Sequence, residues 1–124
     1  MAKSQCIVAV VDDDQSMLNS IEYLLDAHGF GAELFSSAET FVRRDTLDDI
    51  SCLVLDIHLG GMSGVDLQRI LSDRGYRFPV IFITAVADEA ITDAVRDAGC
   101  PLLRKPFSSG GLISAISRAI EQSQ

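Results

Sequence analysis

Three short apolar runs in this chain stop abruptly at ionisable residues. The boundaries are Asp12-Asp13-Asp14 after Ile7–Val11, Asp56 after Leu53-Val54-Leu55, and Lys105-Pro106 after Leu102-Leu103. Such runs are typical of buried parallel strands, whose carboxyl ends share one edge of an open α/β sheet, where ligands bind. Carboxylates far apart in the sequence are therefore predicted to meet there, beside one lysine. Like charges so close need a cation, which indicates a divalent metal and phosphate chemistry.

The length and composition fit one globular domain spanning residues 1–124. With 124 residues, 48% of them hydrophobic and 23% charged, the chain can bury a core of its own. Its formal charge of −8 argues against nucleic acid as a direct partner, because phosphate backbones need Lys and Arg. The start, Met1-Ala2-Lys3-Ser4-Gln5, has no long apolar stretch. We therefore expect no signal peptide, no membrane span and a cytoplasmic location.

Three cysteines, Cys6, Cys52 and Cys100, show no C-x-x-C spacing, so the sequence indicates neither a zinc site nor a disulfide framework. Each lies near the start of a predicted strand, opposite the acidic edge. We expect buried, reduced, structural thiols, which is the usual state of a free cysteine. A redox role for Cys6 and Cys52 stays open if their strands pair.

Apolar runs alternate with amphipathic segments five times, which is typical of stacked βα units. The predicted strands are Ile7–Val11, Gly31–Phe35, Cys52–Asp56, Pro79–Thr84 and Pro101–Arg104. We predict an α/β fold with a doubly wound, five-stranded parallel sheet, five helices and the flavodoxin-like strand order 2-1-3-4-5.

Residues that favour helix starts precede each amphipathic segment. Ser36 and Glu39 have the spacing of a capping box, which predicts a helix through about Arg44. The other predicted N-caps are Asp14, Ser63, Asp88 and Ser108.

Polar residues follow or end four of the five predicted strands, as a single site at one sheet edge requires. They are Asp12-Asp13, Asp56, Thr84 and Lys105. Two or three carboxylates can hold Mg²⁺, which prefers hard oxygen ligands. A central carboxylate can attack phosphorus and form an aspartyl phosphate, while a hydroxyl and an ammonium bind the phosphoryl oxygens.

In these positions the chain resembles the receiver domain of two-component response regulators. The matching segments are Val10-Val11-Asp12-Asp13, Asp56 with Met62-Ser63-Gly64, Ile83-Thr84-Ala85, and Lys105-Pro106-Phe107. The resemblance runs from Ile7 to about Ile120. Each motif alone is weak, but four in the correct order at predicted strand ends are specific.

The resemblance implies a role for each acidic residue. Asp56 would accept a phosphoryl group from a histidine kinase, a phosphotransfer protein or a small phosphodonor. Asp13 would bind Mg²⁺ or Mn²⁺ directly, and Asp12 would act partly through water. Asp56 and the backbone carbonyl of His58 would complete the protein's share of the metal ligands.

The resemblance also implies how the signal is passed on. Lys105 would pair with Asp56 before the reaction and with phosphate after it. Thr84 would turn its hydroxyl onto the phosphoryl oxygen, and the small Ala85 would leave room for phosphate. A downstream domain or protein would read the surface of the fourth helix, last strand and last helix, and a phosphorylation-dependent dimer is compatible with the family. Such a domain is a signalling switch that catalyses at most its own phosphorylation and dephosphorylation.

The sequence departs from the family pattern in three places. The stretch Gly99–Lys105 is one residue shorter than the common spacing. Gly60 stands where the loop after the acceptor usually has proline, so this loop is expected to hold the His58 carbonyl less firmly. Leu102 replaces the aromatic ring that usually moves together with Thr84. We therefore expect the switch to reside mainly in the loop at residues 85–88 and the following helix. His58 and Val86 occupy the positions that tune the phosphate lifetime in the family.

Two other functions compete with this interpretation. A pseudo-receiver would bind partners without being phosphorylated. A phosphatase of the haloacid dehalogenase type would use Asp12 as nucleophile within Asp12-x-Asp14, but that leaves Asp56 unexplained and requires a longer chain. The segment Ser36–Phe41 is similar to receivers attached to helix-turn-helix transcription factors, which would not make this domain itself bind DNA.

Overall fold

A computed structural model describes residues 6–44, 47–85, 89–97 and 99–123. The strands are β1 (Ile7–Val11), β2 (Gly31–Phe35), β3 (Ile50–Asp56), β4 (Val80–Thr84) and β5 (Leu102–Arg104). The helices are α1 (Gln15–Ala27), α2 (Ala38–Val42), α3 (Gly64–Asp73), α4 (Glu89–Asp97) and α5 (Ser109–Gln122). The strands form one parallel sheet in the order β2-β1-β3-β4-β5, which confirms the predicted fold.

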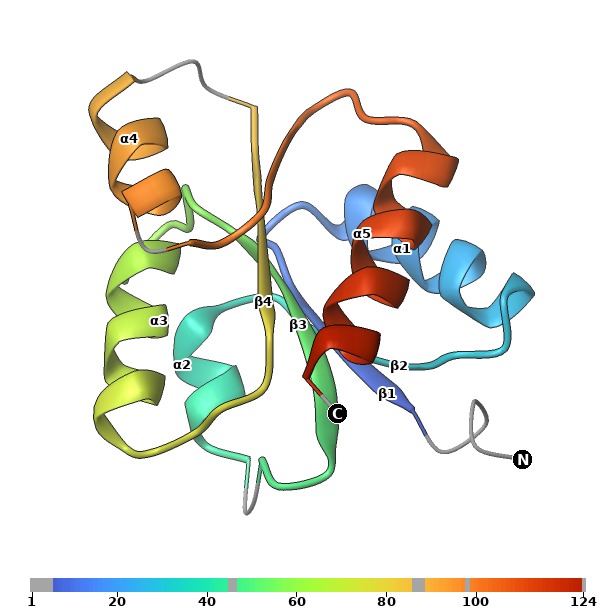
Figure 1. Cartoon of the computed structure of the whole chain (residues 1–124), viewed down its shortest axis with the longest axis horizontal. Coiled ribbons are helices and arrows are strands. Elements are labelled where there is room, and N and C mark those ends of the chain that lie inside the picture. Colours follow the sequence, from blue (N-terminus) through green and yellow to red (C-terminus); the bar gives the residue numbers. More distant parts are fainter. Residues whose placement is uncertain (1–5, 45–46, 86–88, 98, 124) are drawn as a thin grey trace.

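Helices cover both faces of the sheet (Figure 1), with α1 and α5 on one face and α2, α3 and α4 on the other. Side chains alternate between the two faces along each strand. In β1, Val8 and Val10 pack toward α1 and α5, whereas Ala9 and Val11 pack toward α2 and α3. Burial of both faces explains why the strands are almost continuously apolar.

The capping prediction for α2 was wrong by one residue. Ser37, not Ser36, is the N-cap, because the Ser37 Oγ accepts a hydrogen bond from the Thr40 backbone N–H at 3.1 Å. The helix ends at Val42 rather than near Arg44. The caps at Asp14, Ser63 and Ser108 are confirmed by the same kind of hydrogen bond, and Asp88 lies outside the described residues.

Other strand boundaries differ slightly from those predicted. β3 begins at Ile50, two residues early, because Ile50 pairs with Ile7 before a register shift. Strands β4 and β5 begin one residue later than predicted, after Pro79 and Pro101.

The three cysteines are free thiols, and their burial differs. Cys52 is buried as predicted, but Cys6 and Cys100 are only half-buried because they precede β1 and β5. Within the described ranges, no helix has the length and apolar character needed to cross a bilayer.

The sheet register brings the strand ends together at one edge. The Asp12 N–H donates to the Phe35 carbonyl at 3.1 Å, continuing the β1–β2 ladder past its end. Similarly, the Lys105 N–H donates to the Thr84 carbonyl at 2.8 Å, beyond the end of β5. The backbone thus fixes where the polar residues that follow each strand must lie.

Candidate functional site

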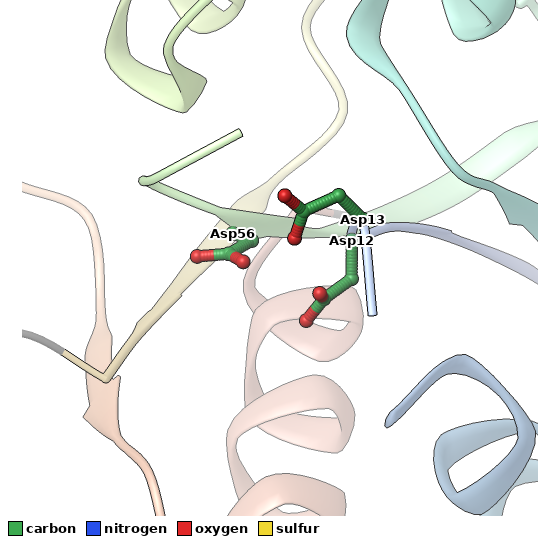
Figure 2. A group of neighbouring side chains, drawn as sticks. All are labelled: Asp12, Asp13 and Asp56. Carbon is green, nitrogen blue, oxygen red and sulfur yellow. The ribbon is translucent and has the colours of Figure 1, made fainter. Parts of the chain in front are cut away.

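Three carboxylates meet at the carboxyl edge of the sheet. Asp12 and Asp13 follow β1, and Asp56 is the last residue of β3. One oxygen atom from each lies within 4.8 Å of the others. Figure 2 shows the side chains around one space, with Asp12 and Asp13 on one side and Asp56 on the other. Asp12 and Asp56 are buried, with 0% and 4% of their surface exposed, whereas Asp13 is exposed.

Lys105 connects the two buried carboxylates. Its Nζ lies 2.9 Å from Asp12 Oδ2 and 3.4 Å from Asp56 Oδ2. Burying a charge without a partner is costly, so this pairing is what allows two carboxylates to stay within the fold. The lysine directly follows β5, the strand at one edge of the sheet, so its position depends on how β5 pairs with β4.

The cluster remains short of positive charge despite the lysine. Burial and the neighbouring Asp12 charge raise the pKa of Asp56 to about 6, while Lys105 and the His58 N–H oppose that rise. Burial lowers the pKa of Lys105, but the hydrogen bond to Asp12 and the charge of Asp56 outweigh it, so the net direction is upward. Above neutral pH, Asp56 is mainly ionised and a cation beside it would be stabilising.

Backbone groups fix the orientation of both buried carboxylates. The Asp14 N–H donates to Asp12 Oδ1 at 2.9 Å, and the His58 N–H donates to Asp56 Oδ1 at 3.1 Å. Each carboxylate thus uses one oxygen for a backbone N–H and the other for Lys105. These contacts hold the acidic groups in place before any ligand arrives.

Gly64 permits the close approach of α3 to the end of β3. A Cβ at this position would lie 2.3 Å from the Asp56 carbonyl oxygen and 2.9 Å from the Ile57 Cα. The Gly64 N–H also donates to the Ile57 carbonyl at 2.8 Å. Sequence reasoning included Gly64 in a motif but assigned it no role. A glycine directly after the N-cap Ser63 was the available signal.

Comparison with known proteins identifies the family. The family model of the response regulator receiver domain matches residues 8–117. The chain belongs to this family. Receiver domains are signalling domains, generally not enzymes, and bind Mg²⁺ through acidic residues.

Similar proteins agree with this assignment. The receiver domain is 34% identical over 114 residues to the transcriptional regulatory protein TdiR of Thauera aromatica, covering 91% of this chain and 50% of TdiR. It is 37% identical to nodulation protein W of Bradyrhizobium diazoefficiens, covering 98% and 54%. The solved structure of response regulator StyR matches with a TM-score of 0.88 at 37% identity, covering 96% and 61%. The chain spans about half the length of the curated relatives it matches.

The remaining predicted site residues lie at or near the same edge. Thr84 ends β4 and is buried, and Ala85 after it is exposed. The His58 side chain is also exposed, although its N–H is bonded to Asp56. Leu102 pairs with Phe82 and is partly buried against the core. Val86 and the rest of the predicted switch loop, residues 86–88, lie outside the described residues.

Asp14 serves the helix rather than the acidic cluster of the receiver domain. Its Oδ1 accepts hydrogen bonds from the Ser16 and Met17 N–H groups, so it caps α1. The Ser16 hydroxyl also donates to this oxygen at 2.8 Å. This bond contributes most to lowering the pKa of Asp14, followed by the two backbone N–H bonds. The Asp12-x-Asp14 pair therefore does not act as one unit, and neither this geometry nor the family match favours a dehalogenase-type phosphatase.

The donor set fits a small hard cation. Asp12, Asp13 and Asp56 offer carboxylate oxygens at mutual distances that one ion can bridge. Within the described ranges, no hydrogen bond or ion pair occupies the Asp13 carboxylate. Exposed beside two buried acids, Asp13 is available to a cation entering from solvent.

Proposed function

We propose that residues 1–124 act as one receiver domain that accepts a phosphoryl group on Asp56 in a Mg²⁺-dependent reaction. The supporting observation is the position of Lys105, whose Nζ lies 2.9 Å from Asp12 and 3.4 Å from Asp56. Asp56 is thus a buried carboxylate beside the Lys105 ammonium group, with the exposed Asp13 nearby.

The reaction at Asp56 is a phosphoryl transfer between two residues. An oxygen of the Asp56 carboxylate attacks the phosphorus of a phosphohistidine on a histidine kinase or phosphotransfer protein. The P–N bond breaks, its electron pair stays on the imidazole nitrogen, and that nitrogen then takes a proton from solvent. Acetyl phosphate would serve in the same way, with acetate as the leaving group.

Four residues would hold the metal ion: Asp12, Asp13, Asp56 and, through its backbone carbonyl, His58. When bound, Mg²⁺ or Mn²⁺ supplies positive charge that offsets the charge of the phosphoryl oxygens. Lys105 would shift from Asp56 to the new phosphoryl group, because the phosphorylated oxygen loses its negative charge to the phosphate.

Thr84 and Ala85 would communicate the new state. The Thr84 hydroxyl would donate to a phosphoryl oxygen, and Ala85 would leave space for that oxygen. The change would bias the fourth helix and its neighbours between two arrangements. We propose that a downstream domain or protein reads the α4-β5-α5 face, with a phosphorylation-dependent dimer as one form of output.

The names of the relatives support a role in gene regulation, and we propose that this domain acts in the cytoplasm. TdiR is a transcriptional regulatory protein, and this chain matches about half of its length. We propose that the receiver domain controls such an output without itself contacting nucleic acid, in keeping with a net charge of −8.

Intact-mass analysis after incubation with acetyl phosphate, with and without Mg²⁺, tests the proposal. Wild type should gain one phosphoryl group only with Mg²⁺, and Asp56→Asn should gain none. Asp14→Asn is the matched control, because asparagine preserves the helix cap and Asp56 is intact. This variant should be phosphorylated like wild type.

Two other outcomes would change the assignment. A gain that survives Asp56→Asn would mean that another aspartate, such as Asp12, is the acceptor. No gain from acetyl phosphate or from a phosphorylated histidine kinase would instead indicate a pseudo-receiver.

A further inference from the structure

A carboxylate from another helix contacts the loop that follows Asp56. This loop, residues 57–63, connects β3 to α3 and contains Gly60 and Gly61. The Met62 N–H donates to Glu39 Oε2 at 3.4 Å, across 23 residues of sequence. Glu39 lies in the first turn of α2, outside the acidic cluster.

The Glu39 carboxylate also packs closely against Gly61. A Cβ built on Gly61 would lie 3.0 Å from Glu39 Oε2 and 3.6 Å from its Cδ. The neighbouring Gly60 differs, because a Cβ there would meet nothing within 4 Å. Glu39 therefore lies against Gly61 and not against Gly60.

The other polar anchors of the loop lie at its two ends. The His58 N–H is bonded to Asp56 Oδ1, and the Gly64 N–H to the Ile57 carbonyl. Between these ends, Leu59 and Met62 are partly buried against the core. Glu39 thus supplies a polar contact in the stretch where two glycines leave the backbone most freedom.

We propose that Glu39 is a positioning residue, which fixes the β3–α3 loop so that the backbone at His58 is ready to bind the metal ion. This inference rests on the proposed function, in which the His58 carbonyl is a metal ligand. Ordering a loop costs conformational entropy when the ligand binds, and an anchor formed beforehand removes part of that cost. Glu39 thereby compensates for the absence of proline at position 60.

Metal affinity is the first measurement, with Mn²⁺ as the probe and the electron paramagnetic resonance signal of free Mn²⁺ as readout. Glu39→Ala should bind Mn²⁺ about twofold more weakly, because a 3.4 Å hydrogen bond to an exposed side chain is weaker than one of ordinary length. Glu39→Gln keeps an acceptor oxygen at the same place and should recover most of the affinity. The rate of phosphorylation by acetyl phosphate at subsaturating Mg²⁺ should follow the same order.

The glycine pair offers a matched control. Gly61→Ala places a methyl group 3.0 Å from Glu39 Oε2 and should weaken Mn²⁺ binding in the same direction as Glu39→Ala. Gly60→Ala has free space around the new methyl group and should bind Mn²⁺ like wild type. Both variants stiffen the unfolded chain similarly, so the difference between them isolates the contact with Glu39.

A readout without metal separates failure of this inference from failure of the proposed function. The Met62 amide should exchange faster and shift in its proton resonance in Glu39→Ala. An unchanged Met62 amide would overturn the inference, whether or not wild type binds metal. If wild type binds Mn²⁺ and is phosphorylated but Glu39→Ala matches it, only the role of Glu39 is wrong. Equal losses in Glu39→Gln and Glu39→Ala would also overturn it, because the hydrogen bond would then not matter.

Discussion

The space beside the Asp56 backbone is too small for any residue larger than glycine at position 64. At Gly64, even one methyl group would enter the space of the Asp56 carbonyl oxygen, at 2.3 Å. The backbone of Asp56 and the start of α3 are therefore in contact without any side chain between them. Any larger residue must move one of the two, and a displaced β3 end would also displace the Asp56 carboxylate.

Gly64→Ala should destabilise the domain by about 2 kcal/mol, as overpacking typically does, and slow phosphorylation by acetyl phosphate. Gly110→Ala is the control, since a Cβ in that part of α5 meets nothing within 4 Å. It should stabilise by roughly 0.5 kcal/mol, because alanine favours a helix more than glycine does. Urea unfolding measures both. Equal unfolding free energies for the two variants would contradict the close approach at Gly64.

Helix α2 shows how a short element can contribute to a distant loop. It has five residues, too few for stability by itself, and depends on Phe41 in the core and on its N-cap. Phe41 packs edge-on against Phe35 of β2, with ring centroids 5.0 Å apart. The position of Glu39 therefore depends on the packing of Phe41 and on the Ser37 N-cap.

Ser37→Ala should lower the unfolding free energy by about 1 kcal/mol, because the Thr40 N–H loses its acceptor. Ser36→Ala removes the neighbouring exposed serine and should have almost no effect. Thermal or urea unfolding of the two variants makes the comparison. A larger loss at Ser36 would restore the capping box that the sequence suggested.

The domain consists of a sheet whose two faces are covered by helices, and Cys52 lies in the central strand β3. Its side chain is fully buried, and this desolvation raises the pKa of the thiol to about 12. The folded state thus holds the thiol proton more tightly than the unfolded chain. The resulting stability is present below about pH 9 and is lost as pH rises toward 12.

Between pH 8 and 10.5, wild type should therefore lose about 2 kcal/mol more stability than Cys52→Ala, from the linkage of proton binding to folding. Urea unfolding under reducing conditions at the two pH values measures this difference. The alanine variant will be less stable throughout because it leaves a cavity, so the slope against pH is the quantity that matters. Parallel slopes would show that the folded protein does not suppress ionisation of Cys52.

The same scale explains what the sequence could reveal. The sequence predicted that Asp12, Asp56 and Lys105 would meet. All three end or follow parallel strands, and the carboxyl ends of such strands lie at one edge of the sheet. Ser36 satisfied the capping-box pattern with Glu39 and Ser37 did not, yet Ser37 is the N-cap, because its Oγ accepts the Thr40 N–H. The contact of Glu39 with Met62 joins side chain to backbone between two non-adjacent elements, which no periodicity encodes.

The lysine at the site has a consequence for protein synthesis. Lys105 is separated by 93 residues from Asp12 and by 49 residues from Asp56, its two partners. At about 5–20 residues per second, a ribosome adds those 49 residues in roughly 2–10 s. During that interval the nascent chain already contains Asp12 and Asp56 but not yet the lysine that lies between them. A nascent chain that has not yet reached Lys105 therefore lacks the positive charge that lies between Asp12 and Asp56 in the folded domain.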